Sequence, residues 1–154
     1  MAGSNTRAID GHQVKLTSPD KVMYPNSGMT KQEVIAYYTS VAGVLLPQLK
    51  DRVVTRIRYI DGVGGERFFE KNVQRGMPEW IRDVTVSASP GTGKDAKQVR
   101  YPLIDNLAGL TWMANAAALE LHTPQWRGGA RRGGGLADPP AIDLRPGGGG
   151  EVRD

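Results

Sequence analysis

The sequence of 154 residues contains no cysteine and only two histidines, His12 and His122. Without cysteine the chain can form neither disulfides nor thiolate zinc sites, and it cannot use thiol catalysis. We also expect no metal site built mainly from histidine. No stretch approaches the roughly 20 consecutive apolar residues of a membrane-spanning helix, and residues 1–10 lack the hydrophobic segment of a signal peptide. We therefore expect a cytoplasmic protein without membrane contact.

The charge of the chain is moderately basic. Lys and Arg outnumber Asp and Glu by 20 to 16, for a net charge of +4. This balance suits a polyanionic partner, because each cation that neutralises a phosphate releases a condensed counterion. A mildly basic solvated surface explains the same number equally well. The placement of the charges must therefore decide between the two.

The clearest predicted element is a helix from Thr30 to Leu49. Thr30 and Glu33 have the spacing of a capping box, and apolar residues follow at helical intervals. Pro47 is expected to kink this helix or end it early, because proline removes an amide donor and clashes with the preceding turn.

A strand is predicted from Val53 to Ile60. Its period of two places Thr55 and Ile57 on one face, with Arg56 and Arg58 on the other. The face that carries the two arginines is expected to point to solvent.

The other predicted elements are shorter. They are a strand, a turn and an extended piece over 13–25, a turn at 26–28, a short strand at 67–71, a helical turn at 77–81, a strand at 84–87, a mobile loop at 89–97 and a helix at 106–121. Together they predict an α+β fold with a small mixed or antiparallel sheet and two main helices.

The two ends of the chain differ from residues 13–127 in composition. Residues 1–12 are expected to form a flexible leader that is ordered only if something ties it down. Residues 128–154 are rich in glycine and arginine. They are expected to form a flexible tail, because they can bury little apolar surface.

Six basic residues form a candidate anion-binding set. Lys15, Lys21 and Lys31 lie near the first turn and the start of the first helix, and they are joined by Arg52, Arg56 and Arg58 on the predicted strand. A lysine at a helix N-terminus opposes the helix dipole unless an anion binds there, and free amides at that end favour an anion. Lysines scattered over a solvated surface are the alternative interpretation.

Two further features could contact nucleic acid. The only phenylalanines of the chain, Phe68 and Phe69, are adjacent in a predicted strand and flanked by Arg67 and Lys71. Such an arrangement suits base stacking, although both rings could instead pack in the core. His122 follows the second predicted helix, where it could meet a triphosphate or simply cap the helix.

A carboxylate motif near residue 143 lacks one member. Two-metal nucleotidyl transfer commonly uses carboxylates at positions i and i+2 of one strand, because both can ligate the metal ions. Asp143 is followed at this spacing by Arg145. Asp143 is a candidate catalytic and metal-binding residue, and an ordinary surface aspartate is the alternative.

Seven segments together resemble one family. They are VKLTSPDKVMYP (14–25), TK (30–31), YYT (37–39), TRIR (55–58), FFEKN (68–72), PLID (102–105) and LELHTPQW (119–126). Over residues 13–127 the chain resembles the polymerase/primase domain of bacterial ligase D. That family belongs to the archaeo-eukaryotic primase superfamily and serves non-homologous end joining. The resemblance implies the N-terminal part of a primase-type polymerase fold.

The resemblance implies roles for the lysine and aromatic positions. Ser18, Lys21 and Lys31 match a pocket that grips the 5′-phosphate at a DNA break, and relatives often have asparagine at the position of Ser18. Phe68 and Phe69 match an aromatic pair that packs on the DNA near that pocket.

Further contacts are implied for the strand residues. Arg56, Arg58 and Lys71 are expected to bind DNA, and Arg58 keeps a basic position of the family. His122 matches a residue close to the incoming nucleotide. Ile57 stands where relatives commonly have lysine, which puts one strand or nucleotide contact in doubt.

The chain departs from the family after Arg127. Relatives carry two aspartates separated by one residue and followed by proline and glycine. Residues 143–147 look like this motif with Arg145 in place of the second metal ligand. The family then continues and supplies a third carboxylate and a segment that holds the triphosphate. Intact relatives use Mg²⁺ or Mn²⁺, and we expect this chain to bind neither well.

We therefore expect a DNA-end-binding module of a bacterial end-joining polymerase, by family a nucleotidyltransferase, that is truncated and inactive alone. The alternatives are a non-catalytic protein that binds 5′-phosphorylated DNA ends while a partner does the chemistry, a minimal primase completed by a separate chain, and a non-functional fragment of a disrupted gene. Expected partners are 5′-phosphorylated DNA ends, a nucleoside triphosphate in intact relatives, a Ku-type protein and a ligase, in the nucleoid-associated cytoplasm.

Overall fold

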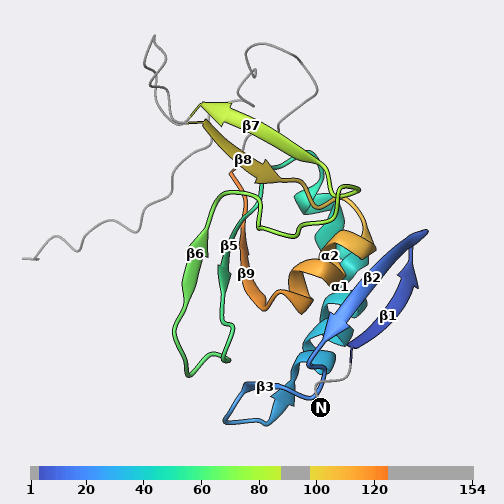
Figure 1. The fold of residues 1–154 in the computed structure, drawn as a ribbon, viewed down its shortest axis with the longest axis vertical. Coiled ribbons are helices and arrows are strands. Elements are labelled where there is room, and N and C mark those ends of the chain that lie inside the picture. Colours follow the sequence, from blue (N-terminus) through green and yellow to red (C-terminus); the bar gives the residue numbers. More distant parts are fainter. Residues whose placement is uncertain (1–3, 88–97, 125–154) are drawn as a thin grey trace, which may run out of the picture.

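The computed structural model describes residues 4–87 and 98–124. Their elements are β1 (Ser4–Ile9), β2 (His12–Thr17), β3 (Val22–Tyr24), β4 (Met29–Thr30), α1 (Lys31–Leu49), β5 (Thr55–Arg58), β6 (Phe68–Glu70), β7 (Asp83–Ser87), β8 (Gln98–Pro102), α2 (Leu107–Asn115) and β9 (Ala118–His122) (Figure 1). The predicted mobile loop at 89–97, the tail at 128–154 and the motif at Asp143 lie outside the described residues.

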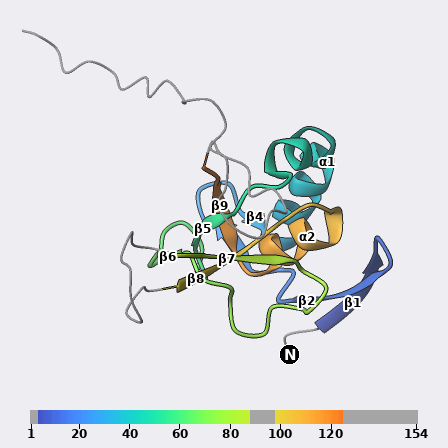
Figure 2. The same cartoon turned by 90° about the horizontal axis from the view of Figure 1, so that it is seen from above.

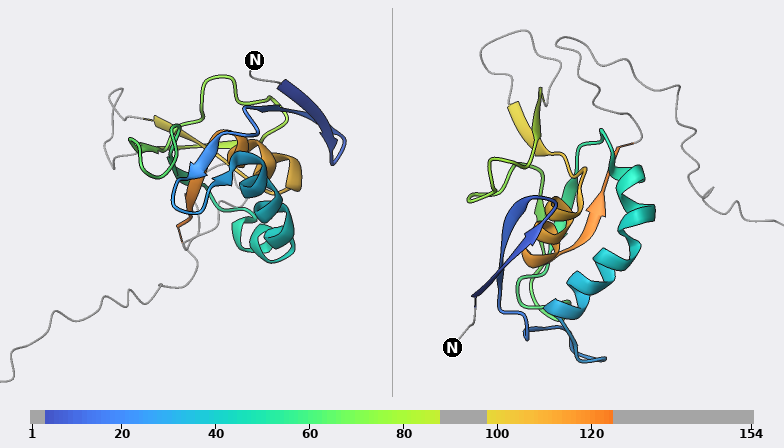
Figure 3. Two further views of the ribbon diagram at one scale, coloured as in Figure 1. Left: turned by 90° about the horizontal axis from the view of Figure 1, so that it is seen from below. Right: turned by 90° about the vertical axis from the view of Figure 1, so that its right-hand side faces the viewer.

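The described strands form small antiparallel sheets. β5 lies between β6 and β9 in a three-stranded sheet, and β1–β2, β3–β4 and β7–β8 are two-stranded. The two helices lie together on one side of the three-stranded sheet (Figure 2), and α1 runs alongside β9 (Figure 3, right). The predicted α+β class is confirmed.

Helix α1 begins as predicted. Glu33 accepts a hydrogen bond from the Thr30 amide at 2.7 Å, and the Thr30 hydroxyl accepts one from the Glu33 amide at 3.4 Å, which completes the capping box. The expectation that Pro47 ends the helix early is wrong, because α1 continues to Leu49. Pro47 has no amide to donate to the Gly43 carbonyl. Both residues are exposed, so water can hydrate that carbonyl.

The core lies between the two helices, β2 and β9. Its larger members include Val14, Leu16, Met23, Val34, Ile35, Tyr38, Leu49, Val54, Ile104, Leu110 and Met113. The Tyr38 hydroxyl donates a hydrogen bond of 2.7 Å to the Ala118 carbonyl, and burial raises the pKa of Tyr38. This buried bond ties α1 to β9.

The second predicted helix is shorter than expected. α2 ends at Asn115, Ala117 has a left-handed φ of +61°, and residues 118–122 form strand β9. The prediction of one helix over 106–121 is therefore wrong at its end. The apolar residues there fit a helix or a strand equally well, and pairing with the distant strand β5 decides the outcome. Residues 77–81, predicted as a helical turn, contain a single turn, which a hydrogen bond of 3.1 Å from the Ile81 amide to the Pro78 carbonyl closes.

Most of the predicted leader is tied down in this structure. β1 pairs with β2 along its whole length through a two-residue turn at Asp10 and Gly11, which both have positive φ. Positive φ at both positions is the signature of the type I′ hairpin turn that Asp-Gly favours. The Asp10 carboxylate accepts a hydrogen bond from the Leu107 amide at 3.0 Å. The His12 ring stacks on the Trp80 ring, with 4.4 Å between the ring centroids. These contacts fix the hairpin to the rest of the fold.

Candidate nucleic-acid interface

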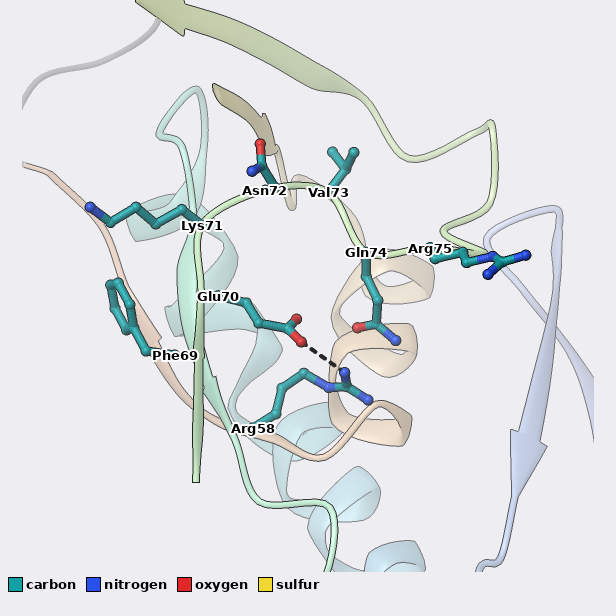
Figure 4. A pocket seen from close by; sticks show the side chains of 8 residues that line it. All are labelled: Arg58, Phe69, Glu70, Lys71, Asn72, Val73, Gln74 and Arg75. Atoms are coloured by element: carbon teal, nitrogen blue, oxygen red, sulfur yellow. Dashed lines mark hydrogen bonds and ion pairs between the residues drawn. The ribbon is translucent and has the colours of Figure 1, made fainter. Parts of the chain in front are cut away.

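Two neighbouring pockets share one wall. The first, which we call the lysine pocket, has a volume of about 360 Å³ and is lined by Thr17, Ser18, Lys21, Lys31, Arg58, Ile60, Gln74, Arg75, Gly76, Trp112, Asn115, Ala116 and Ala117. The second, which we call the strand pocket, has a volume of about 610 Å³ and is lined by Arg58, Phe69, Glu70, Lys71, Asn72, Val73, Gln74 and Arg75 (Figure 4). Arg58, Gln74 and Arg75 belong to both pockets.

Lys31 is the most enclosed cation of the lysine pocket. The residue is 7% exposed, and its Nζ donates a hydrogen bond of 2.9 Å to the Thr17 carbonyl. No carboxylate among the described residues pairs with it. Burial, followed by repulsion from Lys21 and Arg58, lowers the pKa of Lys31. The pocket thus holds an ammonium group that an anion would stabilise.

Lys21 has a carboxylate partner that is easily displaced. Its Nζ lies 2.9 Å from Oδ1 of Asp61, whose side chain is 76% exposed. Exposed ion pairs contribute at most about 1 kcal/mol. An arriving phosphate can therefore compete with Asp61 for Lys21.

The first amides of α1 are already used inside the fold. The amides of Lys31 and Gln32 donate to the carbonyls of Lys21 at 2.8 Å and Pro19 at 2.9 Å. The expectation that free amides at this helix end attract an anion is therefore wrong for these two groups. Attraction at this pocket must come from the cationic side chains.

Ser18 holds a strained backbone conformation beside the lysines. Its φ is +48°, and its carbonyl accepts a hydrogen bond from the Lys21 amide at 3.1 Å. Left-handed φ is costly for most residues, and asparagine tolerates it best after glycine. A following proline also disfavours helical backbone at Ser18. Asparagine would adopt this backbone conformation with less strain than serine does.

Asn115 lines the lysine pocket and bonds to the backbone at the end of β2. Nothing in the sequence indicated this role. Oδ1 of Asn115 accepts a hydrogen bond from the Thr17 amide at 2.8 Å, and its Nδ2 donates to the Lys15 carbonyl at 3.2 Å. These bonds connect the end of α2 to the end of β2. An isolated asparagine in an apolar helix gives no sequence signal for such a contact.

Arg56 is completely buried, so the prediction that it faces solvent is wrong. Its Nη2 donates to Glu70 and to the Asn72 carbonyl, both at 2.8 Å, while Nε and Nη1 have no partner among the described residues. Burial lowers the pKa of Arg56, and Glu70 acts in the opposite direction. A period of two separates two faces but cannot show which face is covered. A DNA contact by Arg56 stays a prediction.

Arg58 joins the two pockets. Its Nη1 lies 3.0 Å from Oε1 of Glu70, and its Nε donates to the Ala116 carbonyl at 2.7 Å. Figure 4 shows Glu70 pointing across the strand pocket to Arg58. Glu70 therefore compensates both Arg56 and Arg58, and the three groups together keep one positive charge.

Both phenylalanines are exposed, Phe68 by 39% and Phe69 by 57%. The alternative in which both rings are core residues is therefore wrong. The Lys71 ammonium lies 5.7 Å from the centre of the Phe69 ring. An exposed ring with a cation beside it suits contact with a nucleic-acid strand, and that role stays a prediction.

The remaining sequence candidates lie outside both pockets. His122 ends strand β9 rather than a helix, so the expectation of a helix cap is wrong, and its Nε2 lies 3.3 Å from Oε2 of Glu120. The Tyr59 hydroxyl also bonds to Glu120, and this bond, followed by that of His122, lowers the pKa of Glu120. Arg52 donates to the Pro124 carbonyl at 2.9 Å, and Lys15 is exposed on β2.

In residues 4–87 and 98–124, no three histidine or acidic side chains are placed to share a metal ion. Neither described helix is long and apolar enough to cross a membrane.

The comparison with known families decides the identity of the domain. A family model described as the LigD primase-polymerase domain matches residues 30–154. The chain belongs to this family. The family resemblance is thereby confirmed, and the match also includes residues 128–154, which lie beyond the range 13–127 over which the resemblance was seen. The family uses divalent metals.

Curated LigD proteins are similar over most of this chain. The LigD multifunctional non-homologous end joining protein of Mycolicibacterium smegmatis is 44% identical over 115 residues, which are 75% of this chain and 14% of that protein. LigD of Mycobacterium tuberculosis is 43% identical over 140 residues, 88% of this chain and 18% of that protein. The bifunctional LigD of Bacillus subtilis is 33% identical over 134 residues, which are 85% of this chain and 20% of that protein. The chain thus spans a fifth or less of each relative.

A solved structure has the same fold. The polymerase domain of Mycobacterium tuberculosis ligase D in complex with DNA matches with a TM-score of 0.71 and 42% identity. The match covers 81% of this chain and 42% of that chain. The protein is therefore a homologue of a polymerase domain that takes part in DNA repair by non-homologous end joining.

Proposed function

We propose that this chain binds 5′-phosphorylated DNA ends through the lysine pocket, as the end-recognition module of a bacterial end-joining polymerase. The observation that carries the proposal is the enclosed Lys31 ammonium, which has no carboxylate partner among the described residues and stands beside Lys21 and Arg58. A buried cation without an anion is costly, and functional sites keep such groups for their ligands. A terminal phosphate dianion supplies the missing charge.

The chemistry of the surroundings supports DNA over a free anion. The lysine pocket lies beside the strand pocket, whose lining residues include Phe69 and Lys71, and the side chains of these two project to the other side of β6 from Glu70 (Figure 4). A polynucleotide offers bases for stacking and phosphates for the cations at the same time. The similar polymerase domain from M. tuberculosis was solved in complex with DNA. The site of action would be the nucleoid, with a Ku-type protein and a ligase at the same break.

Binding to recessed DNA ends with and without a 5′-phosphate tests the proposal. Fluorescence anisotropy at two salt concentrations should show tighter binding of the phosphorylated end by about tenfold or more, as expected for charge-assisted hydrogen bonds. Lys31→Met, which keeps an apolar stem, and Lys21→Gln should each reduce this preference. Lys50→Gln is the matched control, because Lys50 is exposed and follows the far end of α1, roughly 28 Å from Lys31.

Equal affinity of the wild-type chain for the two ends would overturn the proposal. Thermal melting of each variant separates a lost contact from a lost fold. Binding that is weak, equal for both ends and abolished by moderate salt would leave only general attraction between a basic surface and DNA.

Nucleotidyl transfer by this chain alone is not part of the proposal, because Arg145 stands where the second carboxylate of a two-metal site is needed. We expect no extension of a primed end with Mg²⁺ or Mn²⁺ and all four nucleotides. Extension above a no-enzyme control would contradict this expectation and would require carboxylates from elsewhere in the chain.

A non-functional fragment is the second candidate, and exposed apolar side chains on α1 favour it. Val44 is 76% exposed and Tyr37 60%, and both line an apolar pocket with Leu119 and Leu121. A large uncovered apolar surface binds the dye ANS and loosens the fold. Strong ANS fluorescence with broad thermal melting and no phosphate preference would support this candidate against end recognition.

A further inference from the structure

The wall shared by the two pockets carries an arginine without a counterion. Arg75 is exposed and forms no hydrogen bond or ion pair with any other described residue. Arg58 and Lys21 differ in this respect, because Glu70 and Asp61 partly neutralise them. Arg75 therefore leaves a full positive charge at the passage between the pockets.

The backbone presents Arg75 at the corner of a turn. The Met77 amide donates a hydrogen bond of 3.0 Å to the Gln74 carbonyl, and Gly76 has a φ of +81°. Positive φ at the third position of a β-turn is readily adopted by glycine. The preceding segment is anchored, because the Val73 amide donates to the Arg100 carbonyl at 2.7 Å. The Arg75 side chain thus extends from a fixed point.

Gln74 adds a polar group to the same wall. Its Oε1 is buried without a hydrogen-bond partner among the described residues. Figure 4 shows its side chain directed toward Arg58 and Glu70, whereas Arg75 extends away from them. A side-chain amide offers both donors and an acceptor, so it can serve a polar ligand in either orientation. The Gln74 amide and the Arg75 guanidinium together suit a negatively charged ligand that also forms hydrogen bonds.

We infer that Arg75, with Gln74 beside it, binds the first internucleotide phosphate of the strand whose 5′-phosphate occupies the lysine pocket. This inference rests on the proposed end recognition. The lysine pocket and the strand pocket, which Phe69 also lines, share Arg58, Gln74 and Arg75, so a strand that occupies both pockets passes these three residues. Its phosphodiester then meets the one cation of this wall that lacks a counterion among the described residues.

A neutral backbone linkage provides the test. Two 5′-phosphorylated recessed ends are compared, one unmodified and one with a methylphosphonate at the first internucleotide linkage. Arg75→Ala should weaken binding of the unmodified end about threefold to tenfold and reduce the salt slope by about one ion. On the methylphosphonate end, the wild-type chain and Arg75→Ala should bind equally well.

One control variant and one further test variant complete the experiment. Arg7→Ala removes an exposed arginine of β1 outside both pockets and should leave both affinities unchanged. Gln74→Glu keeps the shape of the wall, adds a negative charge and should weaken binding of the unmodified end. Equal losses for Arg75→Ala on both ends, or no loss on either, would overturn the inference. The absence of any preference for the 5′-phosphate in the wild-type chain would instead refute the proposed function.

Discussion

Glu70→Gln tests the electrostatic arrangement at the centre of the site. The Glu70 carboxylate lies 2.8 Å from Nη2 of Arg56 and 3.0 Å from Nη1 of Arg58. Glutamine keeps the shape of the side chain and removes its charge. The Arg56 side chain has no exposed surface, so its guanidinium would remain buried without a compensating anion.

The expected loss of folding free energy is about 3 kcal/mol. Removing one partner of a buried ion pair typically costs about 3–5 kcal/mol. We expect the lower end of this range, because the Glu70 side chain is 28% exposed and the Asn72 carbonyl still accepts a hydrogen bond from Arg56. This loss is a large fraction of the roughly 5–15 kcal/mol that stabilises a typical domain.

Urea unfolding of the wild type, Glu70→Gln and Asp105→Asn measures this effect. Asp105→Asn is the control, because it breaks the ion pair with Arg82, whose side chain is 55% exposed, and should cost less than about 1 kcal/mol. DNA affinity of folded Glu70→Gln should rise, since a negative charge leaves the strand pocket. A stability loss no larger than that of the control, or a fall in DNA affinity of the folded variant, would refute the reasoning.

Three other substitutions test separate parts of the fold. Ser18→Asn should raise the unfolding free energy by up to about 1 kcal/mol, because asparagine tolerates the left-handed backbone; unchanged stability in urea would contradict this. Thr30→Ala should cost about 1 kcal/mol through the lost cap. Hydrogen bonds from Thr30 lower the pKa of Glu33, so its contribution is present above the ordinary pKa of the carboxyl and is lost as pH falls through the lowered value; a Glu33→Gln chain should lack this acid-dependent loss in urea titrations from pH 7 to 3. Tyr38→Phe should cost about 1–2 kcal/mol, because the Ala118 carbonyl loses its buried hydroxyl donor, and a loss of melting temperature measures it.

Local sequence signals predicted the elements that depend on neighbouring residues. The capping box at Thr30 and Glu33 located the start of α1, alternation located β5, and the paired aromatic residues located β6. The Asp10-Gly11 turn carried an equally local signal for the first hairpin, which the prediction of a flexible leader passed over.

Errors arose where distant segments decide the structure. The fate of residues 118–122 depends on pairing with β5, and the burial of Arg56 depends on Glu70 and Asn72, which follow a loop. Periodicity carries no information about such partners.

The candidate site was predicted only in part. The family resemblance named Ser18, Lys21 and Lys31, and the structure brings these three residues together in one pocket. Gln74 and Arg75 were missed, because a polar pair in a loop has no pattern that separates it from an ordinary solvated turn.

The most direct test of the central claim is the pKa of the 5′-phosphate on the bound DNA end, followed by ³¹P nuclear magnetic resonance. The second ionisation of a phosphate monoester lies near pH 6. Because Lys21 and Lys31 would stabilise the dianion, the account predicts that this pKa falls on binding to the wild-type chain and falls less with Lys31→Met. A phosphate that is bound with an unchanged pKa would show that it does not enter the lysine pocket, and the account of end recognition would be wrong.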